Sequence, residues 1–274
     1  MTTEMSHAPD PKDRERIIER FTELCERDER IVAAFLGGSL ARDADDRFSD
    51  LDLCIVFADA ALRDIEVNRA AMIAELGTPL FLEDWGEDDP VLFAILADGT
   101  EIELHRIPEG RLREVEVGPI RPLLDRGGIL AGLELPLSAP HPDELRDECR
   151  RLLAWFWHDV AHTVAAIGRG QLWWAHGQVE ALRGYCVNVV RLEQRSAPGG
   201  EPYWKIEEEI AVASLAPLAA TIVPLDRAAL TRAASELVAF FGAHGRRAAE
   251  AYDLPYPDEL ERLMLRELDA VADA

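Results

Sequence analysis

The chain has 274 residues, of which 48% are hydrophobic and 30% charged, as expected for a soluble globular protein and not for a disordered tail or a disulfide-stapled peptide. Its 52 acidic residues outnumber its 29 basic residues, which gives a formal net charge of -23 at pH 7. A surface this negative repels the phosphate backbone and attracts cations, so we expect no nucleic-acid partner.

Cysteine spacing and the N-terminal sequence bear on the compartment. The four cysteines are far apart and form no C-x-x-C pair, which argues against a zinc knuckle and a dithiol redox motif. The N-terminal segment is charged where a signal peptide is apolar, and no apolar run approaches the ~20 residues of a membrane span. We therefore expect a cytoplasmic protein with no membrane partner.

The first half of the chain mixes helical and strand patterns. Apolar residues at three- and four-residue spacing predict helices, and β-branched or alternating runs predict strands. The dipeptide Asp98-Gly99 favours a hairpin turn. In chain order we expect a helix over about 12–29, a strand and glycine turn over 31–40, a strand over 50–57, a helix over 60–76 and a hairpin over 91–108.

The second half is predicted to be a helical bundle. Apolar residues lie three and four positions apart in three segments, 145–168, 172–195 and 227–252. The segment 137–145 carries two prolines and a candidate helix cap, Asp143, and is the predicted boundary. The expected α+β protein has an N-terminal α/β domain with a mixed sheet over 1–138 and a helical domain over 139–274.

The most informative stretch joins a glycine turn to two acids. Gly37 and Gly38 allow close approach of a ligand, and a helix starting at Ser39 would turn its N–H groups and hydroxyl to a phosphate. Asp50 and Asp52 alternate with leucines, so both carboxylates are expected on one face, where they suit a hard cation. Each feature alone is common in turns and solvated strand ends; their combination predicts a site.

This order of features resembles the nucleotidyltransferase superfamily typified by DNA polymerase beta and the antibiotic nucleotidyltransferases. In that family a strand leads to a G-G/S turn that opens a helix, the next strand carries D-x-D, and a later strand carries a third acid. The matching residues are Gly38, Ser39, Asp50 and Asp52, with one carboxylate in the strand EIELHRI. The resemblance is strongest over 31–57 and weaker towards the C-terminus.

The third acid has two candidates. The family pattern D-G-x-x-h-[DE]-h matches ADGTEIELH with Glu103 at the acidic position, and Glu101 is the alternative. Glutamate there is similar to antibiotic-modifying members. The sequence departs from the family at Asp43, where many members have Gly after an Ala-Arg pair, and this implies a differently shaped loop.

The resemblance implies the roles of these residues. Asp50, Asp52 and Glu103 are expected to hold Mg²⁺, and Gly38 and Ser39 to bind the triphosphate of a nucleotide, most often ATP. Nucleotidyl transfer consists mainly of positioning and charge neutralisation, which carboxylate-bound Mg²⁺ supplies. The acceptor hydroxyl also needs a base outside the metal site.

In similar enzymes that base is a carboxylate on an early helix of the C-terminal domain, across a cleft from the nucleotide. Glu180 is the first candidate because its sequence context is apolar, and Asp159 and Glu193 are the alternatives. The competing interpretation of Glu180 is a helix-surface acid. Lys205, the only lysine after Lys12, is either a triphosphate contact or an incidental surface residue.

The resemblance implies transfer of AMP from ATP to a hydroxyl of a small cationic antibiotic such as an aminoglycoside or a lincosamide, by a monomer or homodimer. One alternative is the same chemistry on a protein, a tRNA end or another metabolite, although the negative charge argues against tRNA. The other is a non-catalytic regulatory member of the fold, against which the presence of all three acids argues.

Two further patterns have structural interpretations. In His158-Asp159-x-x-His162 two histidines lie one helical turn apart, but the glutamate of H-E-x-x-H is absent and no third ligand is evident, so histidines at the core edge are preferred to a zinc site. Tryptophans at helical spacing are expected to pack in the core and not to stack on a ligand. These are Trp155, Trp157, Trp173 and Trp174.

Overall fold

The computed structural model describes residues 11–84, 91–115, 118–131, 133, 140–198 and 201–272. The chain forms two compact units, Met1–Ser138 and Ala139–Ala274. The predicted division between residues 138 and 139 lies outside the described residues. Each unit has its own hydrophobic core.

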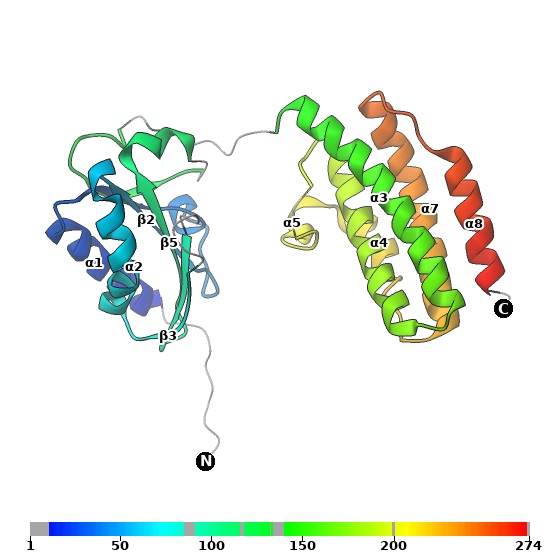
Figure 1. Cartoon of the computed structure of the whole chain (residues 1–274), viewed down its shortest axis with the longest axis horizontal. Coiled ribbons are helices and arrows are strands. Elements are labelled where there is room, and N and C mark those ends of the chain that lie inside the picture. Colours follow the sequence, from blue (N-terminus) through cyan, green and yellow to red (C-terminus); the bar gives the residue numbers. More distant parts are fainter. Residues whose placement is uncertain are drawn as a thin grey trace, which may run out of the picture. The chain divides into compact units, whose positions relative to one another are not determined.

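The first unit is built on a six-stranded sheet with the strand order β3-β4-β5-β2-β1-β6. Figure 1 labels β2, β3 and β5 of this sheet. Strands β2 and β5 pair in parallel and all other neighbours pair antiparallel, so the sheet is mixed. Its elements are α1 (Pro11–Arg27), β1 (Ile31–Leu36), β2 (Leu51–Phe57), α2 (Leu62–Leu76), β3 (Pro79–Asp84), β4 (Val91–Leu96), β5 (Glu101–Pro108) and β6 (Arg121–Asp125). The predicted mixed sheet and hairpin are confirmed.

One face of the sheet is covered and the other is partly open. Apolar side chains of α1 and α2 pack against alternate residues of the strands and form the larger core. A smaller core on the opposite face includes Phe35, Cys54 and Leu112. Farther along that face, strands β3, β4 and β5 leave room for the pocket described below. The open part of the sheet therefore positions the site.

Two strands of this sheet were not predicted. Strand β3 is six residues long and begins with Pro79, and β6 pairs with β1 as the other edge of the sheet. Edge strands tolerate proline and short length because they donate to a single neighbour. Strand β3 is as long as β1 and β4 but begins with proline, and β6 has only five residues, so neither sequence carries a clear strand signal.

The second unit is a helical bundle, as predicted. Phe156 and Phe241 stack in its core with ring centroids 3.6 Å apart, and Trp157 is buried against them. Within the described residues its helices are α3 (Pro142–Gly168), α4 (Leu172–Glu193), α5 (Ile206–Glu209), α6 (Val212–Ala219), α7 (Arg227–Ala251) and α8 (Asp258–Ala272) (Figure 1). None of the described helices combines the length and the apolar character needed to cross a bilayer.

Two sequence predictions for this unit are wrong in detail. His141, and not Asp143, caps α3: its Nδ1 accepts a hydrogen bond from the Asp143 N–H, and Glu144 accepts one from the His141 N–H. Of the four tryptophans only Trp157 packs in the core. The other three are 50%, 82% and 38% exposed, in the order Trp155, Trp173 and Trp174. Helical periodicity alone does not reveal which apolar face of a helix a neighbouring helix covers.

The stacked aromatic pair yields a test of the bundle core. We expect Phe241→Ala to lower the free energy of unfolding by about 3–5 kcal/mol, because it removes a fully buried ring and leaves a cavity. Trp173→Ala, which truncates an 82% exposed side chain, should change it by less than about 0.5 kcal/mol. Urea denaturation measures both values, and equal effects of the two variants would contradict this core.

Candidate active site

The glycine turn after β1 lies directly against the first acidic strand. The Gly37 N–H donates to the Asp52 carbonyl oxygen at 3.0 Å, which ties the turn to β2. Gly38 has φ +57°, and a Cβ there would overlap the Asp52 carboxylate. Glycine is therefore required at position 38 for both its backbone conformation and its lack of a side chain.

Ser39 follows with a buried hydroxyl that has no hydrogen-bond partner among the described residues. Leaving such a group unpaired costs about 1–3 kcal/mol, so a ligand oxygen at this position would be stabilising. The α-helix expected here is a single 3-10 turn, Leu40–Arg42. Asp43 ends this turn at φ 52°, a left-handed conformation that favours glycine, so the departure from the family pattern keeps the backbone shape that Gly would adopt.

The parallel pairing of β2 and β5 sets Asp52 opposite Glu103. His105, two residues farther along β5, joins them: its Nε2 lies 3.6 Å from the Glu103 carboxylate, and ligand atoms of all three side chains lie within 4.8 Å of one another. Glu103, and not Glu101, is the carboxylate facing Asp52. The register therefore favours Glu103 as the third acid.

The electrostatics of this cluster favour a cation. Burial and, to a smaller extent, the nearby charges of Asp50 and Glu103 raise the pKa of Asp52 to about 6, against opposing effects of His105 and Arg42. Concentrated negative charge that is partly buried is stabilised by a bound dication. Carboxylate oxygens suit Mg²⁺, so the residues present fit the ion that the sequence predicts.

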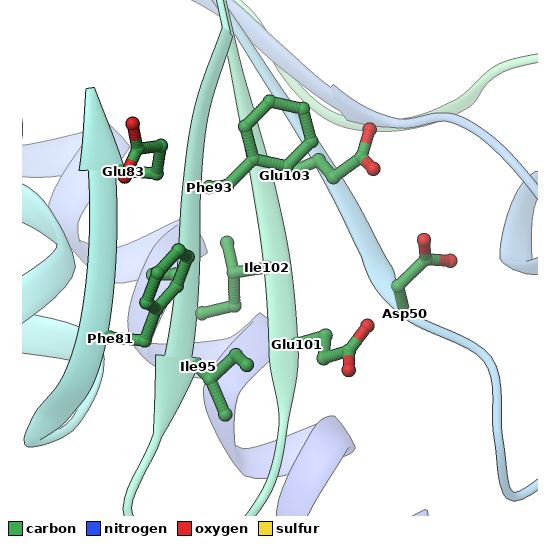
Figure 2. A pocket seen from close by; sticks show the side chains of 9 residues that line it. Asp50, Phe81, Glu83, Phe93, Ile95, Glu101, Ile102 and Glu103 are labelled. Atoms are coloured by element: carbon green, nitrogen blue, oxygen red, sulfur yellow. The ribbon is translucent and has the colours of Figure 1, made fainter. Parts of the chain in front are cut away.

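Beside the carboxylates a pocket of about 290 Å³ opens on the sheet (Figure 2). Phe81 of β3 and Phe93 of β4 form its apolar wall, and acidic side chains surround them. Figure 2 shows the acids Asp50, Glu101 and Glu103 on the β5 side and Glu83 on β3. The pocket therefore combines aromatic surface with several negative charges next to the proposed metal ligands.

Part of this arrangement was missed by sequence reasoning. Phe81 and Glu83 lie on β3, the edge strand that was not predicted. His105 had a readable signal, because strict alternation in EIELH places it on the same face as Glu101 and Glu103. The family pattern drew attention to the acids alone.

Comparison with known proteins decides the family. A family model described as streptomycin adenylyltransferase matches residues 12–193, more than half of the chain. The chain belongs to the streptomycin adenylyltransferase family. The expected membership of the nucleotidyltransferase superfamily is thereby confirmed, and this protein is a nucleotidyltransferase.

Among solved structures, the chain is similar to an aminoglycoside 6-adenyltransferase from Bacillus subtilis, with 15% identity, a TM-score of 0.46 and coverage of 97% of this chain and 100% of that one. It is also similar to a nucleotidyltransferase-like protein from Exiguobacterium sibiricum 255-15, with 12% identity, a TM-score of 0.43 and coverage of 94% and 89%. No curated protein matches the chain.

The base and the triphosphate contact predicted in the helical unit, Glu180 and Lys205, differ from each other in their surroundings. Glu180 on α4 accepts a hydrogen bond from Arg183, which is itself anchored on Thr221. These side chains and Tyr203 line a second pocket of about 280 Å³. Lys205 is exposed, and its ammonium lies 4.4 Å from the centroid of the Trp204 ring.

The carboxylates of the two alternative bases, Asp159 and Glu193, are each held by two neighbouring side chains. Burial alone would raise the pKa of Glu193, but hydrogen bonds from Arg247 and His244 lower it. Asp159 accepts from the Tyr185 hydroxyl at 3.0 Å and contacts His158 at 2.9 Å. Glu193 is thus committed to its ion pairs and is the weakest candidate base.

The raised pKa of Asp52 predicts a pH-dependent cost in stability. Between pH 3.8, its ordinary pKa, and about 6, the folded state holds a proton that the unfolded state has lost, so stability falls as pH rises through this window. Asp52→Asn removes the ionisation. In EDTA it should therefore raise the free energy of unfolding by about 1–2 kcal/mol at pH 7.5 and by much less at pH 4.

Thermal denaturation at several pH values measures this difference. Glu109→Gln, at an exposed position of the same unit, is the control and should leave the pH profile unchanged. A gain from Asp52→Asn that is the same at pH 4 and pH 7.5 would rule out the raised pKa as its cause.

Proposed function

We propose that this nucleotidyltransferase transfers AMP from ATP to a hydroxyl of a small cationic antibiotic, with an aminoglycoside preferred and a lincosamide second. The observation that carries the proposal is the acidic, aromatic pocket beside the paired carboxylates of Asp52 and Glu103. Membership of the streptomycin adenylyltransferase family agrees with it.

In this proposal Asp50, Asp52 and Glu103 hold one or two Mg²⁺, which neutralise charge on the phosphates when bound. Gly38 and Ser39 contact the triphosphate, and the buried, unpartnered hydroxyl of Ser39 supports that role. The turn brings these contacts beside the carboxylates because Gly38 packs on Asp52.

The reaction forms a bond between the acceptor oxygen and the α-phosphorus and breaks the bond from that phosphorus to the pyrophosphate oxygen. Pyrophosphate leaves with the electron pair, and the hydroxyl proton passes to a carboxylate base. We assign this base to Glu180, and a triphosphate contact to Lys205. Both side chains are exposed in their own unit, that of Glu180 to 47%, which leaves them accessible to a substrate.

The pocket chemistry supports a cationic acceptor. Glu83 and Glu101 add negative charge beyond the proposed metal ligands, and Phe81 and Phe93 present ring surface to which ammonium groups bind by cation–π attraction. The net charge of -23 adds a long-range field that concentrates polycations. A polyamine-like aminoglycoside uses all of these features, whereas a lincosamide has a single amine.

A transfer assay with ATP labelled on the α-phosphate tests the acceptor. With Mg²⁺ we expect label on aminoglycosides, less on lincosamides and none on neutral sugars, tRNA or a protein mixture. The acceptor KM should rise several-fold as salt increases from about 0.05 to 0.3 M, because exposed charges are screened over about 8 Å at 0.15 M. Transfer to neutral sugars alone would refute the cationic acceptor while leaving the chemistry intact.

The position of the third acid is tested by two matched variants. Glu103→Gln should reduce kcat by about a hundredfold or more, because it removes a carboxylate that faces Asp52 across the β2–β5 pair. Glu101→Gln, on the same strand and the same face, should reduce kcat by less than about tenfold. The reverse order of the two effects would move the third acid to Glu101.

A further inference from the structure

The second unit carries a cluster of metal-ligating side chains that the transfer reaction does not use when Glu180 is its base. His158 and His162 lie one turn apart on α3, with ring centroids 4.3 Å apart. Asp159 lies beside them: the distance from its Oδ1 to Nδ1 of His158 is 2.9 Å. Ligand atoms of all three residues lie within 4.8 Å of one another.

A neighbouring helix holds the carboxylate of this cluster in place. The Tyr185 hydroxyl, on α4, donates to Oδ2 of Asp159 at 3.0 Å. Burial, together with the hydrogen bond to Asp159 and the charge of that carboxylate, raises the pKa of Tyr185 to about 12, so the phenol remains a donor at neutral pH. With Oδ2 held by Tyr185, Oδ1 is directed to His158, as partners outside a metal's ligand shell commonly orient its ligands.

Aromatic rings flank both imidazoles. The Trp155 ring lies edge-on to His158 with centroids 4.9 Å apart, and the Trp174 ring lies 5.8 Å from that of His162. These contacts restrict the side-chain rotations of both histidines, which lowers the entropy lost on binding an ion. The His158 side chain is 49% exposed, so the cluster is open to solvent and an ion can enter.

We propose that His158, Asp159 and His162 bind one borderline transition-metal dication, with Zn²⁺ as the preferred ion. Two imidazoles at i and i+4 on a helix are a geometry that chelates zinc, and two nitrogens with one oxygen select such ions over Mg²⁺. The ion would lie where Nδ1 of His158 and Oδ1 of Asp159 approach each other at 2.9 Å. The third ligand that the sequence did not reveal is therefore Asp159 itself.

This site is independent of the proposed transfer reaction and differs from the first-unit cluster in chemistry. The Asp52 cluster is dominated by carboxylates, which suit Mg²⁺, and has one imidazole, His105. The second-unit site has two imidazoles. The second-unit site also lacks the glutamate that acts as general base in H-E-x-x-H. It therefore offers a metal three protein ligands and an open position, but no such base.

Calorimetric titration of the chain, freed of any histidine tag, with ZnCl₂ tests the proposal. The double variant Asp52→Asn/Glu103→Gln is used as background, so that the first-unit cluster contributes little. We expect one equivalent of Zn²⁺ with a micromolar Kd, and at least a tenfold weaker affinity when His158→Gln or His162→Gln is added. His176→Gln, at an exposed histidine on α4, is the matched control and should leave the affinity unchanged.

Two further measurements keep the test decisive. Co²⁺ should give visible absorption bands that disappear in His162→Gln, because that substitution removes a nitrogen ligand. If the background variant does not fold, the same substitutions in the unmodified chain should each remove one equivalent. Zn²⁺ binding no tighter than millimolar, or binding that is equally weakened by His176→Gln, would overturn the proposal.

Discussion

The parallel pairing of β2 with β5 is the constraint on which the candidate active site depends. The two strands are separated in sequence by α2, β3 and β4, and their register sets Asp52 beside Glu103. Two carboxylates at adjacent positions repel each other, so this pairing lowers the stability of the sheet. The arrangement becomes favourable when a dication neutralises both charges.

The glycine turn after β1 packs against this charged pair. Because Gly38 has no side chain, its backbone packs on the Asp52 carboxylate and increases the burial that raises the pKa of Asp52. The same turn leaves the Ser39 hydroxyl buried without a partner in the described part of the chain. Local stability is thus reduced at several neighbouring positions, a pattern typical of sites that are completed by ligands.

The two units present different chemistry on scaffolds with separate cores. In the first, strand alternation gathers carboxylates and aromatic rings on an open part of the sheet. In the second, helical periodicity brings two imidazoles to one surface, and the neighbouring helix supplies Tyr185 to hold Asp159. Hard and borderline cations would therefore select different units of the same chain.

The sequence by itself determined the α+β class, the central helices and strands, the hairpin and the family resemblance, because these follow from local periodicity and from motif spacing. Tertiary structure decided which side chains meet. The β2–β5 register sets Glu103, and not Glu101, opposite Asp52 and places His105 beside them, and pairing with β4 forms the edge strand β3 that carries Phe81. Such contacts depend on register and packing between distant segments, which no local pattern encodes.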